Sequence, residues 1–205
     1  MKKMFLCLAF VGMIMNVSAQ ETQNTQSMPK HEVYAGVGLL SINQMIPMLA
    51  DAIGTIFTGG YLVQPGDYSA FTPFVGYRHW FSNRFSLGGA FAFDVNSVKV
   101  YNGESSDNQM REVNRYFMTF ALEPKFNYIY RPNFQLYGYL GLGATIVTFA
   151  DANFNDGTKA DISRVPYVNG QLTPIGARFG KEFGGFVEIG VGYKGILNAG
   201  ISYRF

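Results

Sequence analysis

Most of the chain after residue 30 alternates apolar and polar residues with a period of two. The alternation is clearest in the last segment, where Leu197, Ile201 and Tyr203 are each followed by a polar residue. A period of two places successive side chains on opposite faces of a β-strand. The pattern therefore predicts an all-β chain whose strands each have one apolar and one polar face.

Eight segments carry this alternation, and each predicts one strand: 33–39, 75–78, 85–96, 113–130, 133–149, 175–179, 187–194 and 197–205. The connections after the second, fourth and sixth strands are short, whereas those after the first, third and fifth are long. Outer-membrane barrels have short periplasmic turns and longer outside loops. We expect an eight-stranded antiparallel up-and-down transmembrane β-barrel. A soluble β-sandwich would share most of the composition and is the alternative.

Three prolines, Pro73, Pro124 and Pro174, fall within the predicted strands. Proline has no backbone N–H to donate to a ladder, so it is confined to strand ends, sheet edges and bulges. We therefore expect a bulge or a strand end at each of these positions.

The first 19 residues have the features of a secretory signal peptide. Lys2 and Lys3 precede an apolar run at residues 4–15, and residues 17–19 (Val-Ser-Ala) form a small-residue cleavage site. The run is shorter than the roughly 20 residues that a transmembrane helix needs. We expect a signal peptide at 1–19, a flexible periplasmic tail at 20–30 and an outer-membrane β-barrel domain at 31–205.

Cleavage of that peptide would change the composition of the mature chain. It would remove Cys7, the only cysteine, so we expect no disulfide. Loss of Lys2 and Lys3 lowers the number of basic residues from 16 to 14, which equals the 14 acidic residues. A chain without net charge lacks the excess of positive charge that attracts the phosphates of nucleic acids. We therefore expect no nucleic-acid partner.

The first long connection contains a segment with helical periodicity, between Asn43 and Phe57. Its apolar residues recur three and four positions apart: Met45, Ile46, Leu49, Ala52, Ile53 and Ile56. Pro47 suits the first turn of such a helix. Three placements are open: a short capping helix with its apolar face on the barrel rim, a helix that enters the lumen or lies on lipid headgroups, and a strand extension.

A membrane barrel turns the polar faces of its strands, and the charges they carry, toward the lumen. We call these residues the lumen charge cluster: Arg78, Asp94, Glu123, Lys125, Arg178 and Glu188. Side chains alone fill an eight-stranded barrel, and an unpaired buried charge is very costly. We expect a salt-bridged plug, with a narrow ion path as the alternative. Counting from the short turns places four of these residues in the periplasmic half: Arg78, Lys125, Arg178 and Glu188.

Aromatic residues gather near the predicted strand ends on the periplasmic side: Tyr77, Trp80, Phe81, Tyr128, Tyr130, Tyr203 and Phe205. Aromatic rings at the level of the lipid headgroups form girdles around membrane barrels. We expect such a girdle, whereas a soluble fold would bury these rings in its core.

The chain offers little of the chemistry that an active site needs. Its two histidines, His31 and His79, map to the periplasmic side, and no G-x-S-x-G motif is present. The G-x-G-x-x-G match at residues 190–195 lacks the following helix that a dinucleotide site requires, and inward glycines that make room for bulky neighbours explain it better. Three loop aspartates lack the spacing of an EF-hand: Asp151, Asp156 and Asp161. We expect no enzymatic activity, no cofactor and no metal site.

The last eight residues carry the most specific signal. Asn198, Gly200, Tyr203 and Phe205 follow the order polar-x-Gly-x-x-aromatic-x-aromatic. This octet resembles the terminal-strand signal that outer-membrane barrels present to their assembly machinery, which binds it by strand addition. Residues 31–205 as a whole resemble the small OmpA-transmembrane/OmpX-like β-barrel family, a porin-like group of the Gram-negative envelope. The resemblance implies a monomer in the cell outer membrane, with outer-membrane lipid, periplasmic chaperones and the barrel-assembly machinery as partners.

Three functions fit these expectations. The first is a non-enzymatic outer-membrane protein with a structural or surface-interaction role. The second is a small porin or ligand-transfer barrel that passes small solutes. The third is a soluble secreted β-sandwich that acts as a binding module.

Overall fold

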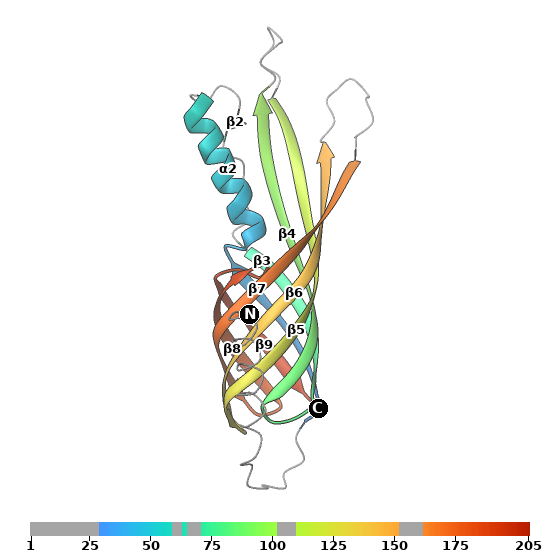
Figure 1. The fold of residues 1–205 in the computed structure, drawn as a ribbon, viewed down its shortest axis with the longest axis vertical. Helices are drawn as coiled ribbons and strands as arrows, with labels where there is room; N and C mark the ends of the chain where they lie inside the picture. Colours follow the sequence, from blue (N-terminus) through green and yellow to red (C-terminus); the bar gives the residue numbers. More distant parts are fainter. Residues whose placement is uncertain (1–28, 59–62, 65–70, 102–109, 152–161) are drawn as a thin grey trace, which may run out of the picture.

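The computed structural model describes residues 29–58, 63–64, 71–101, 110–151 and 162–205 (Figure 1). Its strands are β1 (His31–Leu39), β2 (Val63–Gln64), β3 (Phe71–Trp80), β4 (Phe85–Tyr101), β5 (Met110–Arg131), β6 (Phe134–Asp151), β7 (Ile162–Gly180), β8 (Phe183–Gly192) and β9 (Leu197–Arg204). Its helix is α2 (Ile42–Thr58). The expected signal peptide and most of the expected tail lie outside the described residues.

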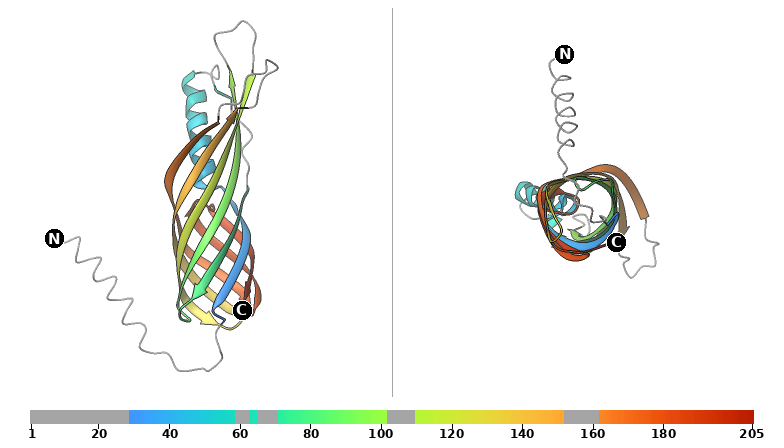
Figure 2. Two further views of the ribbon diagram at one scale, coloured as in Figure 1. Left: turned by 90° about the vertical axis from the view of Figure 1, so that its right-hand side faces the viewer. Right: turned by 90° about the horizontal axis from the view of Figure 1, so that it is seen from below.

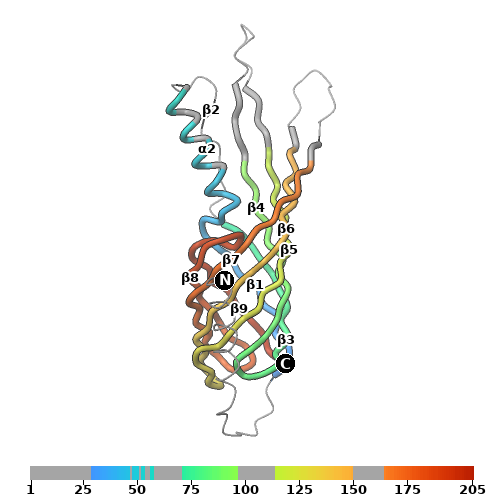
Figure 3. The backbone as a smooth tube through the Cα atoms, viewed as in Figure 1, coloured from blue at the N-terminus to red at the C-terminus, as the bar shows by residue number. Residues whose placement is uncertain are grey.

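Eight of these strands close into a barrel by antiparallel pairing. The order is β1-β3-β4-β5-β6-β7-β8-β9, and β9 returns to pair with β1. This seam extends to the end of the chain, where the Phe205 amide donates to the His31 carbonyl at 3.0 Å. The strands tilt around the long axis (Figure 3), and a view along that axis shows a closed ring (Figure 2). The expected up-and-down barrel is confirmed, and the β-sandwich alternative is wrong.

The two faces of each barrel strand differ in character. Along β9, the side chains of Leu197, Ile201 and Tyr203 are exposed on the outside, whereas Asn198 and Ser202 are buried inside. The same alternation of exposed and buried positions runs through β1, β3 and β8. A soluble protein buries its large apolar side chains and exposes polar ones. This barrel does the reverse, with an apolar exterior and a polar interior.

Short turns join the strands at one end of the barrel. At the other end three connections are longer, and the fourth, between β8 and β9, is a short turn at residues 193–196. Residues 81–84, 132–133 and 181–182 form the turns of the first end, and Phe205 lies at the same end. We call this end the turn end and the opposite one the loop end. β1, β3, β8 and β9 have 8–10 residues, close to the roughly 9–11 with which a tilted strand crosses a membrane.

The four middle strands are much longer than the others. β4 to β7 have 17–22 residues and continue beyond the loop end as a sheet of their own (Figures 1 and 2). We call this extension the projecting sheet: residues 93–101, 110–118, 144–151 and 162–170. β7 has no pairing with β8 before Gln171, so one edge of the projecting sheet is free of a β8 partner.

The start of β7 differs from the prediction. The alternation predicts a strand only from about residue 175, with a long loop before it, but β7 begins at Ile162. Residues 164–166 are all exposed, because the strand has left the barrel there and has no buried face. A strand without a buried face does not need the alternation that marks a half-buried one.

The expected bulge is confirmed at Pro174, whereas the expectation is wrong for Pro124 and Pro73, which lie inside strands and keep their ladder positions opposite Leu87 and Val37. Pro174 coincides with register shifts in both the β6–β7 and the β7–β8 pairing. The β5–β6 pairing is interrupted between Leu122 and Lys125, which spans Pro124. Pro73 comes directly before Phe74, the first residue of β3 that pairs with β4.

Helix α2 follows β1 at the loop end and runs away from the barrel (Figure 1). Its first turn is buried through Asn43 and Gln44, but its apolar side chains are exposed: Met45, Ile46, Met48, Leu49, Ile53, Ile56 and Phe57. The expected short helix in this connection is confirmed. Of the three open placements, the strand extension is wrong because this segment is a helix, and packing of the apolar face on the rim is wrong because the polar first turn makes the contact instead. In the part of the chain that the structure describes, no helix is long and apolar enough to span a membrane.

Candidate functional site

The turn-end half of the lumen contains a carboxylate surrounded by three guanidinium groups. The strand register places Glu32 opposite Arg78 on β3 and opposite Arg204 on β9. Its carboxylate lies 3.8 Å from Arg78 Nη1, 3.6 Å from Arg178 Nε and 3.3 Å from Arg204 Nη2. The Trp80 indole N–H donates to the same carboxylate at 3.0 Å. All five side chains are buried, and we call them the Glu32 cluster.

A second carboxylate, Glu123 of β5, shares Arg78 with Glu32 and pairs with one more cationic group, Lys194. It lies 3.2 Å from Arg78 Nη2 and 2.5 Å from Lys194 Nζ. The hydroxyls of Tyr34 and Tyr193 donate to it at 2.6 and 2.5 Å. Charge-assisted hydrogen bonds of this kind are about twice as strong as neutral ones, so four donors hold this buried charge in place.

Glu188 of β8 completes the set of carboxylates in this half of the barrel. It accepts hydrogen bonds from the Tyr137 hydroxyl at 2.8 Å and from the Tyr139 hydroxyl at 3.0 Å. Lys194 Nζ also lies 3.3 Å from the Tyr139 hydroxyl, so Lys194 connects Glu188 to Glu123 through a tyrosine. The lumen therefore contains one connected polar network rather than isolated pairs.

Basic groups outnumber the carboxylates in this network. Glu32, Glu123 and Glu188 face five cationic side chains: Arg78, Lys125, Arg178, Lys194 and Arg204. Among the described residues, Lys125 has no carboxylate within 4.0 Å, and its ammonium lies 3.2 Å from the ring centre of Tyr137 and 5.5 Å from that of Trp80. Aromatic faces attract cations, and the attraction is larger where water is excluded. The two rings therefore provide the electrostatic stabilisation of Lys125 that a carboxylate provides for the other cationic groups.

Glycines on intervening strands let these side chains meet. In the register, Gly88 lies between Arg78 and Glu123, and Gly176 lies between Tyr137 and Glu188. A Cβ atom on Gly176 would collide with the Tyr137 ring. These two glycines make room for bulky neighbours, as was expected of the glycines at residues 190–195, but Gly192 and Gly195 in that stretch have φ of 148° and 127° instead.

A layer of aromatic rings lies on the loop-end side of the Glu32 cluster. Phe186 and Phe74 face each other across Gly200 and Gly36, which lie between them in the register. Their ring centres are 6.3 Å apart, and the Tyr34 ring lies within 6.5 Å of both. Aromatic side chains and the ion-pair network thus fill the lumen, as an eight-stranded barrel requires.

Asp94 lies apart from this network, near the loop end. Its carboxylate accepts hydrogen bonds from Ser41, Asn43 and Gln44, at 3.1, 2.7 and 3.1 Å, and from the Thr72 hydroxyl. The first three belong to the residues at the start of α2. Asp94 therefore ties the helix to the barrel wall.

Replacement of Asp94 with alanine should release the start of α2. The donors that it binds would lose a buried acceptor, which costs about 1–3 kcal/mol. Hydrogen exchange measured on the refolded protein should show faster exchange of the amides of residues 41–45, with the amides of β9 unchanged. Asp94→Asn, which keeps one acceptor oxygen, should show a smaller effect. Unchanged protection of residues 41–45 in Asp94→Ala would contradict this role.

The structure divides the predicted lumen charge cluster into two groups. Five members belong to the network in the turn-end half: Arg78, Glu123, Lys125, Arg178 and Glu188. The sixth, Asp94, lies with the residues that begin α2. The prediction missed Glu32, although Glu32 comes directly before the first predicted strand and continues its polar face. Arg204 could also have been included, since it occupies a polar position of the terminal strand.

Tyr193 is placed differently from the prediction, whereas Lys194 lies on the inward face to which the alternation assigns it. The alternation puts Tyr193 on the outer face, but both side chains are buried in the lumen. β8 ends at Gly192, whose φ of 148° is one that few residues other than glycine adopt. This backbone conformation interrupts the period of two, so the two consecutive side chains after it point inward.

The expected aromatic girdle is present without its tryptophan. Trp80 is buried and bonded to Glu32, so its assignment to the girdle is wrong. Five of the other predicted rings are exposed around the turn end: Tyr77, Phe81, Tyr128, Tyr203 and Phe205. Tyr130 is partly exposed. Trp80 ends β3 on the inward face, and its position near a strand end did not reveal that orientation.

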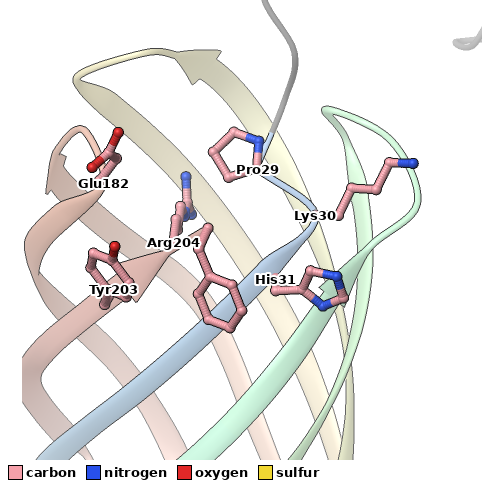
Figure 4. Close-up of a pocket in the computed structure, with 7 residues that line it drawn as sticks. Pro29, Lys30, His31, Glu182, Tyr203 and Arg204 are labelled. Atoms are coloured by element: carbon pink, nitrogen blue, oxygen red, sulfur yellow. The ribbon is translucent and has the colours of Figure 1, made fainter.

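A hollow of about 450 Å³ opens at the turn end, where the chain enters the barrel (Figure 4). It is lined by Pro29, Lys30, His31, Glu182, Tyr203, Arg204 and Phe205. Both His31 and Phe205 belong to the seam between β1 and β9. The hollow therefore lies at the seam, beside the last residue of the chain.

The residues of the expected assembly signal lie on the seam strand. Asn198 points into the lumen, whereas Tyr203 and Phe205 point outward and are exposed. Gly200 pairs with Phe186 and Gly36. Recognition of this octet by assembly machinery stays a prediction.

Few groups with catalytic or metal-binding potential converge in the described residues. None of them forms a group of three or more His, Cys, Asp or Glu side chains that could hold a metal ion. Asp156 and Asp161 lie outside the described residues. The chemistry that the lumen shows is charge pairing, which holds the strands in register.

No family model matches this sequence, and no curated protein matches it. Solved structures with similarity include Ail, the attachment invasion locus protein of Yersinia pestis, in complex with the heparin analogue sucrose octasulfate. That chain is 16% identical, with 86% of this chain and 99% of that chain covered and a TM-score of 0.44. The N-terminal β-barrel domain of Pseudomonas aeruginosa OprF is 9% identical to this chain. The match covers 87% of this chain and 100% of the OprF domain, with a TM-score of 0.44. The fold assignment rests on the strand pairing of this chain itself.

Proposed function

We propose that this protein is a non-enzymatic β-barrel of the bacterial outer membrane that holds its projecting sheet at the cell surface for interaction with partners. The observation that carries the proposal is the inverted barrel. The outside is apolar along all eight strands, and the inside contains the charged network. Lipid is the solvent that favours this arrangement, because apolar side chains face the acyl chains and polar groups are satisfied inside.

The orientation follows from the two ends of the barrel. Short turns face the periplasm in outer-membrane barrels, and longer loops face outward. The turn end would then lie in the periplasm, and the projecting sheet and α2 would lie outside the cell. The free edge of β7 offers unpaired backbone groups to which an extended segment of a partner can add as a strand. Arg164, Val165 and Val168 are exposed along this edge.

Electrophoretic mobility after refolding in detergent tests the barrel in a membrane-like solvent. A folded membrane barrel resists SDS until it is boiled, so samples loaded with and without boiling should migrate differently. Absence of a mobility shift, together with solubility in buffer without detergent, would contradict the proposal.

A small porin is the competing function, and solute flux separates the two. The ion-pair network and the ring layer fill the lumen, so we expect vesicles that contain the protein to pass ions and small sugars no faster than lipid alone. A vesicle swelling assay with a known porin as the positive control makes the measurement. Flux above the lipid background in a heat-shifting preparation would favour the porin.

Deletion of Phe205 should impair assembly in the outer membrane. The residue closes the seam through its hydrogen bonds with His31, and it is the last position of the expected assembly signal. Cell fractionation should show at least a several-fold loss of heat-shifting protein from outer membranes. Deletion of residues 21–25, in the tail, is the control. Normal assembly without Phe205 would show that the terminal octet is not the signal.

A further inference from the structure

The only two histidines of the chain lie side by side on the outer face of the turn end. His31 of β1 and His79 of β3 are directly opposite each other in the strand register. Directly opposite residues of an antiparallel pair project from the same face, with their Cβ atoms about 4.5–5.5 Å apart. The two ring centres are 5.1 Å apart. Forty-seven residues separate the two histidines in sequence, so only the register reveals the pair.

The ring nitrogens of this pair are available to a ligand. His31 Nδ1 lies 2.6 Å from the Tyr77 hydroxyl, which leaves its Nε2 without a hydrogen-bond partner in the described residues. The His79 ring has no hydrogen-bond partner among them. A hydrogen bond at one nitrogen of an imidazole fixes its tautomer and orients the other nitrogen toward a metal. Tyr77 can fill that role when the Nδ1–H of His31 donates to the Tyr77 oxygen, because Nε2 then keeps the lone pair that binds a metal.

We propose that His31 and His79 form a binding site for one divalent transition-metal ion of the Cu²⁺, Ni²⁺ or Zn²⁺ type. Imidazole nitrogen is a preferred ligand of these ions. With metal–nitrogen bonds of about 2.0–2.1 Å, roughly 1.2 Å from nitrogen to ring centre and a tetrahedral angle, two imidazoles on one ion have ring centres about 5 Å apart. The observed 5.1 Å matches this separation.

The surroundings hold the two rings and leave room for further ligands. The His31 ring stacks on that of Phe205 at 5.4 Å, and the His79 ring meets Phe81 edge-on at 4.9 Å. These contacts restrict ring rotation, which lowers the entropy lost on binding. His31 also lines the open hollow at the turn end (Figure 4), so water or an anion from solution can complete the coordination. The two histidines supply only half of a tetrahedral site, so the expected affinity is below that of a closed structural site.

The site would link the first two barrel strands at the end where the seam closes. An ion bound there favours the paired state of β1 and β3, because it binds the folded chain and not the separated strands. The proposal does not depend on the membrane location of the protein, since it rests on the register and on the rings alone.

Copper titration of the mature, untagged protein refolded in detergent tests the site. Cu²⁺ is the probe because it binds nitrogen sites most tightly among these ions. Electron paramagnetic resonance should show one bound Cu²⁺ per chain with nitrogen ligands. His31→Gln and His79→Gln should each lower the affinity at least tenfold. Tyr77→Phe should lower it by roughly 10-fold, the lower end of the usual effect of such outer partners.

Two controls make the result decisive. Tyr203→Phe removes another hydroxyl of the same exposed girdle and should leave the affinity unchanged. It is a matched control because Tyr203 and Tyr77 are both 45% exposed. The heat-dependent mobility shift verifies that every variant is folded. Absence of saturable one-to-one binding, or an affinity that His79→Gln leaves unchanged, would overturn the proposal. Equal loss of affinity in Tyr77→Phe and Tyr203→Phe would overturn the role of Tyr77.

Discussion

Replacement of Glu32 with alanine should destabilise the barrel by about 3–5 kcal/mol, the cost of leaving a buried charge without its partner. Three guanidinium groups surround this carboxylate, and the nearest nitrogens of Arg178 and Arg204 lie within 3.6 Å of it. The remaining acids of the network, Glu123 and Glu188, have their own partners. Three arginines in a water-poor lumen would then repel one another.

Urea titration of the refolded variant, followed by the mobility shift, measures this loss. Glu182→Ala removes an exposed acid at the same end of the barrel and should change stability by less than about 0.5 kcal/mol. The pair Glu32→Gln and Arg204→Gln, combined in one chain, should be more stable than the sum of the single changes predicts, because it removes one charge of each sign. Equal stability of Glu32→Ala and the parent would contradict the pairing of the lumen charges.

Replacement of Gly176 with valine should prevent normal closure of the barrel. Its side chain would occupy the volume of the Tyr137 ring, which is 1% exposed and has no free space to enter. Overpacking of a filled core costs about 1–3 kcal/mol, and displacement of Tyr137 would add the loss of its hydrogen bond to Glu188. We expect a loss of about 3 kcal/mol or more, and a large decrease in the folded fraction after refolding.

Gly185→Val provides the matched control for this variant. Gly185 faces outward on β8, and the nearest atom to a Cβ there is 3.7 Å away, which is ordinary contact. The control should refold as well as the parent chain. Similar refolding yields of the two variants would show that the inward glycines are not required for space.

The architecture was predictable because each barrel strand has one face inside and one face outside, which imposes a period of two on its side chains. The terminal strand shows this directly, since Leu197 and Ile201 are outward and Asn198 is inward as the alternation predicts. The alternation of short and long connections then determines the order of the strands. Both signals are local in sequence, and a single chain is enough to detect them.

The partners within the lumen were not predictable, because they depend on register. Glu32 meets Arg78 and Arg204 only because of the register between neighbouring strands. A shift of a strand by two residues would keep every side chain on the same face, so the alternation does not determine this register. The same applies to the histidine pair. Tyr193 was assigned to the wrong face for a different reason, since the backbone at Gly192 breaks the period on which the prediction relies.

Helix α2 shows the limit of amphipathic periodicity. The helical spacing of the apolar residues predicted the element correctly, but it gave no information on what the apolar face contacts. Polar residues at its start determine its placement, because Asn43 and Gln44 fill the mouth of the lumen beside Asp94. The apolar side chains of α2 beyond that turn are exposed and are not buried against the barrel in the described residues.

The central claim is that the barrel has a lipid-facing exterior and a filled interior. Measurement of spin-label accessibility along β9 in lipid vesicles tests this claim most directly. Residues 20–205 contain no cysteine, so in a protein refolded from these residues single cysteines at positions 197 to 203 can each carry one nitroxide. We predict that collision with oxygen, which concentrates in lipid, is high at 197, 199, 201 and 203 and low at 198, 200 and 202. A polar nickel reagent should reach neither the outward labels near the middle of the strand nor the inward ones. Equal accessibility of odd and even positions, or access of the nickel reagent to the inward positions, would contradict the account.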